Sequence, residues 1–78
     1  MPSPTYSVLV QTVSAYVDPQ RARDVINRQL SGANKNPDTF TGKDLVQLMI
    51  AITTATKMYV PDPSRKEELV AKIKSLAT

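Results

Sequence analysis

The side chains that most often carry enzyme chemistry are either missing from this sequence or explained by local structure. The chain contains no histidine and no cysteine, which excludes Ser-His-Asp and Cys-His catalytic arrangements and removes the usual zinc ligands. The stretch TGKD at residues 41–44 lacks the upstream glycine and the following Ser or Thr of a phosphate-binding loop. Asp18, Asp44 and Asp62 stand where helices are expected to begin. We therefore expect no enzymatic activity, no catalytic residues, no metal and no cofactor.

Basic side chains offer a second kind of chemistry, the binding of phosphate groups. The candidate contacts for an anion or nucleic acid are Arg21, Arg28, Arg65, Lys66 and Lys72. They fall on two expected helices, and side by side these helices would form a basic face that neutralises phosphates. The formal net charge of +3 permits this function without demanding it. The alternative is a solvated surface, since Asp24 and Glu68 are placed for i,i+4 ion pairs with Arg28 and Lys72.

Proline and aspartate divide the chain into four expected helices, at about residues 4–17, 19–31, 42–60 and 63–77. Three of them begin with a capping residue followed by proline, and the third begins with a variant of the capping box, Thr41 and Asp44. Gly32 is expected as the glycine that follows the second helix. The first segment is rich in β-branched residues, so a strand is the alternative there.

These elements predict an all-α fold, a compact four-helix bundle in a single domain over residues 1–78. The stretches YVDPQR and YVPDPSR both read Tyr-Val, then Asp-Pro, then Arg. This similarity suggests two pseudo-repeated helical hairpins as one interpretation. Coincidence is the alternative, because Asp-Pro is simply a good helix start.

The third expected helix carries no charge between Asp44 and Lys57. On a helical wheel its core stripe is expected to comprise Leu45, Leu48, Met49, Ile52, Ala55 and Tyr59. Val46, Ile50, Thr53 and Val60 widen the apolar arc to roughly twice the ~100° that one core requires. Either the helix is central and wrapped by the other three, or part of it is buried by a partner.

We predict a non-catalytic protein–protein interaction or oligomerisation module, in an adaptor or regulatory role. Its partner interface is expected at Val46, Met49, Ile50, Thr53 and Lys57, with help from the first helix. The partner is a second copy, most simply in a homodimer, or a different chain. The absence of cysteine and of a signal peptide or membrane span favours the cytoplasm. The alternative function is a small basic nucleic-acid-binding protein.

Overall fold

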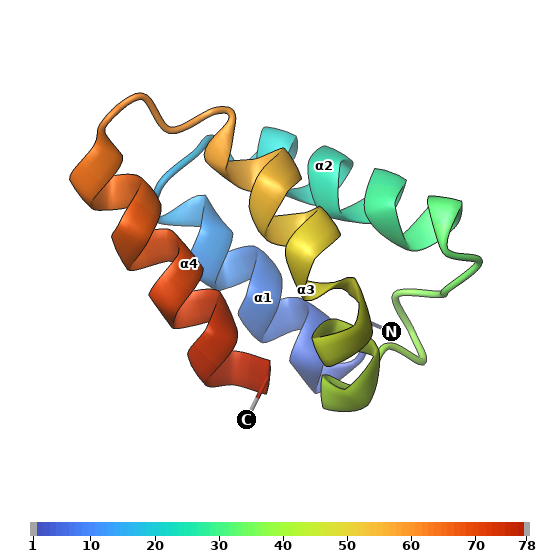
Figure 1. Ribbon diagram of the computed structural model, residues 1–78. Helices are drawn as coiled ribbons and strands as arrows, with labels where there is room; N and C mark the ends of the chain where they lie inside the picture. The colour runs from blue at the N-terminus through green and yellow to red at the C-terminus, as the bar shows by residue number, and fades with distance from the viewer. Residues whose placement is uncertain (1, 78) are drawn as a thin grey trace.

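The computed structural model describes residues 2–77 and contains four α-helices joined by three connections (Figure 1). The helices are α1 (Pro4–Ser14), α2 (Pro19–Gly32), α3 (Gly42–Lys57) and α4 (Pro63–Ala77). No strand occurs within residues 2–77, so the all-α prediction is confirmed and the strand alternative for the first segment is wrong. The Cα radius of gyration is 11.2 Å, close to the about 11.5 Å expected of a compact chain of this length.

All four helices begin at the capping residues that the sequence indicates. The side-chain oxygens that accept a backbone N–H from the first turn belong to Ser3, Asp18, Thr41 and Asp62. The capping box is complete, because the Asp44 N–H donates to the Thr41 hydroxyl and the Thr41 N–H donates to the Asp44 carboxylate. Local hydrogen bonding therefore fixes where each helix starts.

Two helices end earlier than the sequence predicts. α1 ends at Ser14 rather than near Val17, and α3 ends at Lys57 rather than near Val60. Immediately after each helix a backbone N–H bonds a carbonyl three residues back, which tightens the chain into a turn. Pro61 restricts Val60, the residue before it, so it limits how far α3 can extend but does not explain the end at Lys57.

The end of α2 also differs from the prediction. Gly32 is the last helical residue, and Asn34 takes the left-handed conformation, with φ of 60°. The Lys35 N–H then donates to the Leu30 carbonyl at 2.8 Å, which is the long hydrogen bond of a Schellman motif. Asparagine tolerates this conformation better than other non-glycine residues do, so the helix ends without a glycine in the left-handed region.

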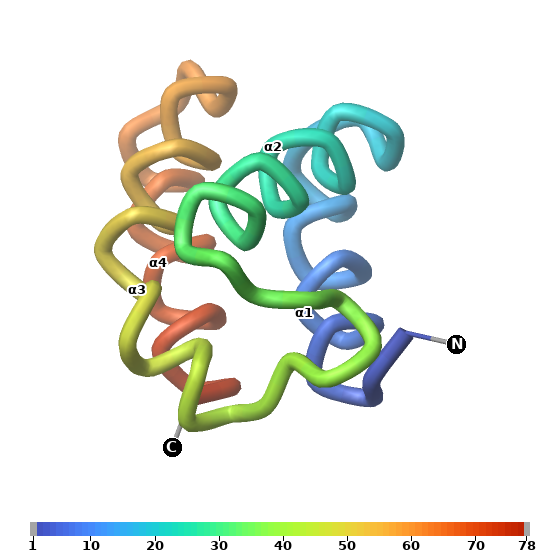
Figure 2. The backbone as a smooth tube through the Cα atoms, turned by 90° about the vertical axis from the view of Figure 1, so that its right-hand side faces the viewer, coloured from blue at the N-terminus to red at the C-terminus, as the bar shows by residue number. Residues whose placement is uncertain are grey.

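The helices form a ring in which α1 packs on α2, α2 on α3, α3 on α4 and α4 on α1 (Figures 1 and 2). The buried apolar side chains come from every helix and two connections: Tyr6, Leu9, Val10, Val13, Ala22, Ile26, Leu30, Phe40, Leu45, Ile52, Val60, Leu69 and Ile73. The α2–α3 connection passes the N-terminal end of α1 (Figure 2), where the Ser3 N–H donates to the Pro37 carbonyl at 3.0 Å. The α1–α2 and α3–α4 connections lie together at the opposite end of the bundle (Figure 1).

Candidate functional site

The outer face of α3 exposes two large aliphatic side chains. Ile50 is 81% exposed and Val46 is 53% exposed. Lys43 and Lys57, which are also exposed, lie on the same side of the helix, and the four residues fall within an arc of about 60° at 100° per residue. We call these four residues, Lys43, Val46, Ile50 and Lys57, the α3 strip. Met49 lies beside the strip but is partly buried against the core.

Thr53 is buried, although the sequence predicts it at the partner interface. Its side chain is only 7% exposed, and its hydroxyl donates to the Met49 carbonyl at 2.8 Å. Thr56 is buried in the same way, with its hydroxyl bonded to the Ile52 carbonyl at 2.8 Å. Because these bonds satisfy the hydroxyls within the helix, threonine can face the core at little cost. The buried face of α3 is therefore rotated toward the threonines. Tyr59, which the sequence places in the core stripe, lies beyond the end of α3 and is 39% exposed.

The α3 strip contains two positive charges and no negative charge. Asp44, which follows Lys43 in the sequence, forms a salt bridge of 3.2 Å with Lys35. Its hydrogen bond with Lys35, followed by the one from the Thr41 N–H, lowers the pKa of Asp44. Within residues 2–77, neither Lys43 nor Lys57 takes part in a salt bridge. The cations of the strip are thus available to an external group.

The first helix does not extend this surface. α1 packs against α2 and α4 rather than alongside α3, and its exposed apolar residue, Val8 at 43%, borders a small depression with Leu76 of α4. The sequence predicts that the first helix helps to form the interface, but α1 does not share the face that carries the α3 strip. The strip is a feature of α3 itself.

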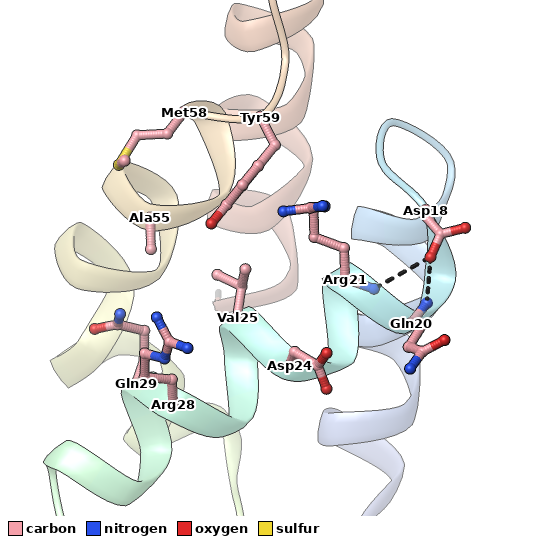
Figure 3. Close-up of a pocket in the computed structure, with 10 residues that line it drawn as sticks. All are labelled: Asp18, Gln20, Arg21, Asp24, Val25, Arg28, Gln29, Ala55, Met58 and Tyr59. Carbon is pink, nitrogen blue, oxygen red and sulfur yellow. Dashed lines mark hydrogen bonds between the residues drawn. The ribbon is translucent and has the colours of Figure 1, made fainter.

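Arg21 and Arg28 line an open groove of about 520 Å³ between α2 and the end of α3 (Figure 3). Asp18 and Asp24 line the same groove, so its charge is mixed rather than uniformly basic. Its α3 wall includes Met58, which is 73% exposed. Within residues 2–77, Arg28 forms no salt bridge with Asp24.

The remaining candidate cations belong to α4, and two of them contact Tyr16. The Arg65 guanidinium stacks at 4.8 Å from the centre of the Tyr16 ring, and the Lys72 ammonium lies 5.2 Å from it. Interaction with the Tyr16 hydroxyl raises the pKa of Lys72. Lys66 is partly buried. Because α2 and α4 are not neighbours in the ring, the five predicted cations do not form the side-by-side basic face that the sequence suggested.

The two helical hairpins, α1–α2 and α3–α4, contact each other through two equivalent Arg–Tyr pairs. Arg21 of the first hairpin stacks at 4.7 Å on Tyr59 of the second, and Arg65 of the second stacks on Tyr16 of the first. Each arginine is the third residue of a helix opened by Asp-Pro, and each tyrosine is the second residue after the preceding helix. This exchange is what a pseudo-twofold relation between the hairpins would produce.

The Arg65 contact predicts a measurable contribution to stability. Arg65 also donates to the Ala15 carbonyl at 3.2 Å, near the end of α1. We expect Arg65→Ala to lower the free energy of unfolding by about 0.5–1 kcal/mol, the range of an exposed cation–π pair, when measured by urea denaturation. Arg28→Ala, which removes an exposed arginine without a ring contact, is the matched control. Equal stability losses in the two variants would contradict this assignment.

Comparisons of the chain with protein-family models, with curated proteins and with solved structures gave no match. No group of three or more His, Cys, Asp or Glu side chains in residues 2–77 is arranged to hold a metal ion. None of the helices in that range is long and apolar enough to cross a membrane. Of the exposed large hydrophobic side chains in residues 2–77, Val46 and Ile50 lie in the α3 strip, and Ile50 is exposed the most, at 81%.

Proposed function

We propose that this protein is a non-catalytic protein–protein interaction module that buries the α3 strip against a second polypeptide. The observation that carries the proposal is the exposure of Ile50, at 81%, next to Val46, at 53%. Burying an aliphatic side chain of this size stabilises a complex by about 1.5–3 kcal/mol. The partner in this proposal is another protein or a second copy of the chain.

The surroundings of the strip support this proposal over an accidental exposure. Val46 and Ile50 are one helical turn apart on the same side of α3, and Met49 adds partly buried apolar surface at their edge. An apolar centre with a polar rim is the usual composition of a protein interface. In this proposal the charged side chains of α2 and α4 favour solubility and the choice of partner. We also propose a cytoplasmic location, because a chain without cysteine suits a reducing compartment.

Nucleic-acid binding through Arg21, Arg28, Arg65, Lys66 and Lys72 is the alternative proposal, and it has less support. Two of these cations share their groove with Asp18 and Asp24, and two others are stacked on Tyr16. Binding to phosphates should weaken steeply as salt rises, whereas burial of apolar surface should persist. Retention on duplex DNA that falls with salt and is lost in the Arg21→Glu, Arg28→Glu double variant would favour the alternative.

Ile50→Glu is expected to weaken the interaction strongly without unfolding the protein. The substitution removes the apolar anchor and would bury a carboxylate in the interface, so we expect binding to weaken by at least about tenfold. The fold should tolerate it because Ile50 is 81% exposed. Sedimentation equilibrium at low and high salt measures self-association, and selection of displayed peptides on the immobilised protein measures binding of a foreign chain.

Ala51→Glu is the matched control, because Ala51 is an exposed neighbour on the same helix and lies about 100° around the axis from Ile50. It introduces the same charge and should leave mass and peptide retention as in the wild type. If Ile50→Glu behaves like the wild type in both measurements, the proposed function is wrong.

A further inference from the structure

The two lysines of the α3 strip are placed symmetrically about Ile50. Lys43 lies seven residues before it and Lys57 seven residues after it. At 1.5 Å per residue, each lysine is about 10.5 Å from Ile50 along the helix axis, and both lie within about 20° of its direction on the wheel. The strip therefore has an apolar centre and a positive charge at each end.

Helix stability explains one of these lysines but not the other. Lys57 lies in the last turn of α3, where the helix dipole favours a cation. Lys43 is the second residue of α3, where the dipole disfavours a cation. Neither lysine forms a salt bridge within residues 2–77. A negative group on a partner would satisfy both, and near Lys43 it would also meet the N-terminus of α3.

This charge pattern is unfavourable for pairing with a second copy along the same strip. In an antiparallel arrangement centred on Ile50, Lys43 of each copy would lie opposite Lys57 of the other. In a parallel arrangement, each lysine would lie opposite its own equivalent. Both arrangements place two pairs of like charges at the edges of the apolar contact, which selects against that partner.

We propose that the partner of the α3 strip is an amphipathic helix of a different protein, with an apolar centre and acidic residues about seven positions to either side. This inference rests on the proposed function and specifies its partner. Such a helix places apolar side chains on Val46 and Ile50 and a carboxylate near each lysine. The positive net charge of the chain, +3, favours encounter with an acidic segment.

The test uses two designed helical peptides of about 20 residues that differ only at two positions. Both carry leucines one turn apart at the centre. The first has glutamate seven residues before and after the central leucine, and the second has lysine there. Binding of each labelled peptide to the full chain is measured by fluorescence anisotropy at low and moderate salt. We expect the glutamate peptide to bind about tenfold more tightly. Two ion pairs at the interface edge favour it and two like-charge pairs weaken binding of the lysine peptide, each by up to about fivefold.

Charge exchange in the protein makes the test specific. The Lys43→Glu, Lys57→Glu variant should reverse the preference between the two peptides. The Arg23→Glu, Arg28→Glu variant is the matched control, since it lowers the net charge equally through exposed arginines of α2, and it should keep the wild-type preference. Added salt should reduce the difference between the peptides, because exposed charges are screened.

Other outcomes separate this inference from the function on which it rests. Equal binding of both peptides, lost in Ile50→Glu, would overturn the acidic partner and leave the interaction surface in place. A salt-insensitive dimer that Ile50→Glu dissociates would mean that a second copy covers the strip. That result would also overturn the acidic partner and leave the interaction surface in place. Failure of both peptides to bind a monomeric chain would overturn the inference. Binding that Ile50→Glu leaves unchanged would overturn the inference and the interaction surface together.

Discussion

Replacing Phe40 with alanine is expected to lower the free energy of unfolding by about 3–5 kcal/mol. Phe40 lies in the α2–α3 connection, directly before the α3 cap Thr41, and its ring is 1% exposed. It is the largest of the fully buried side chains, so its removal leaves a cavity that the neighbouring helices can fill only partly. Domains of this size have total stabilities near the lower end of the 5–15 kcal/mol range. The variant should therefore be partly unfolded at 37 °C.

Urea denaturation followed by far-ultraviolet circular dichroism measures the Phe40 effect. Thr39→Ala is the control in the same connection, because Thr39 is exposed, and it should change stability by about 0.5 kcal/mol or less. A loss below about 1 kcal/mol for Phe40→Ala would mean that the connection does not close the core. The result matters for α3, because Phe40 is adjacent to the capping box that sets where this helix begins.

The second large effect is a contrast between two isoleucines of α3. Ile52→Ala is expected to cost about 2–5 kcal/mol, because Ile52 is 0% exposed within the core. Ile50→Ala should change the stability of the isolated chain by no more than about 0.5 kcal/mol, because Ile50 is 81% exposed. Thermal and urea denaturation of both variants at low protein concentration measure the difference.

This pair of variants also tests the role of Ile50. Both substitutions remove the same atoms from positions two residues apart, so helix propensity affects them alike. Ile50→Ala should instead weaken binding to a partner. Equal stability losses at the two positions would mean that the outer face of α3 is buried in the isolated chain, and no surface would remain for the proposed interaction.

In the proposed binding of an acidic helix to the α3 strip, the exposed lysines provide the selectivity for the partner. An apolar centre provides affinity without distinguishing one amphipathic helix from another, whereas charges at its edges exclude partners of the same sign. The symmetric placement of Lys43 and Lys57 about Ile50 therefore bears on self-association as directly as on binding a different chain.

The buried threonines show why the sequence left the faces of α3 unresolved. The sequence predicts Thr53 at the partner interface, whereas the structure leaves Thr53 only 7% exposed. Between Asp44 and Lys57 the helix has no charged residue to mark its solvent side. Its hydrophobic periodicity therefore fits more than one rotation about the axis. The threonine hydroxyls donate to carbonyls of their own helix. Burying them therefore leaves no unpaired polar group, and the threonines can face the core.

The sequence by itself determined where the helices begin, because capping depends on neighbours within three or four residues. The complete capping box at Thr41 and Asp44 is the clearest example. The sequence left a strand open for the first segment, whose β-branched residues fit either structure. Only the tertiary structure decided the rotation of α3, the separation of α2 from α4, and the stacking of Arg21 on Tyr59. These features depend on how whole helices share one core, and no local pattern contains the packing of residues that are distant in the chain. For the same reason the isolation of Ile50 on the surface became visible only once the helices were assembled.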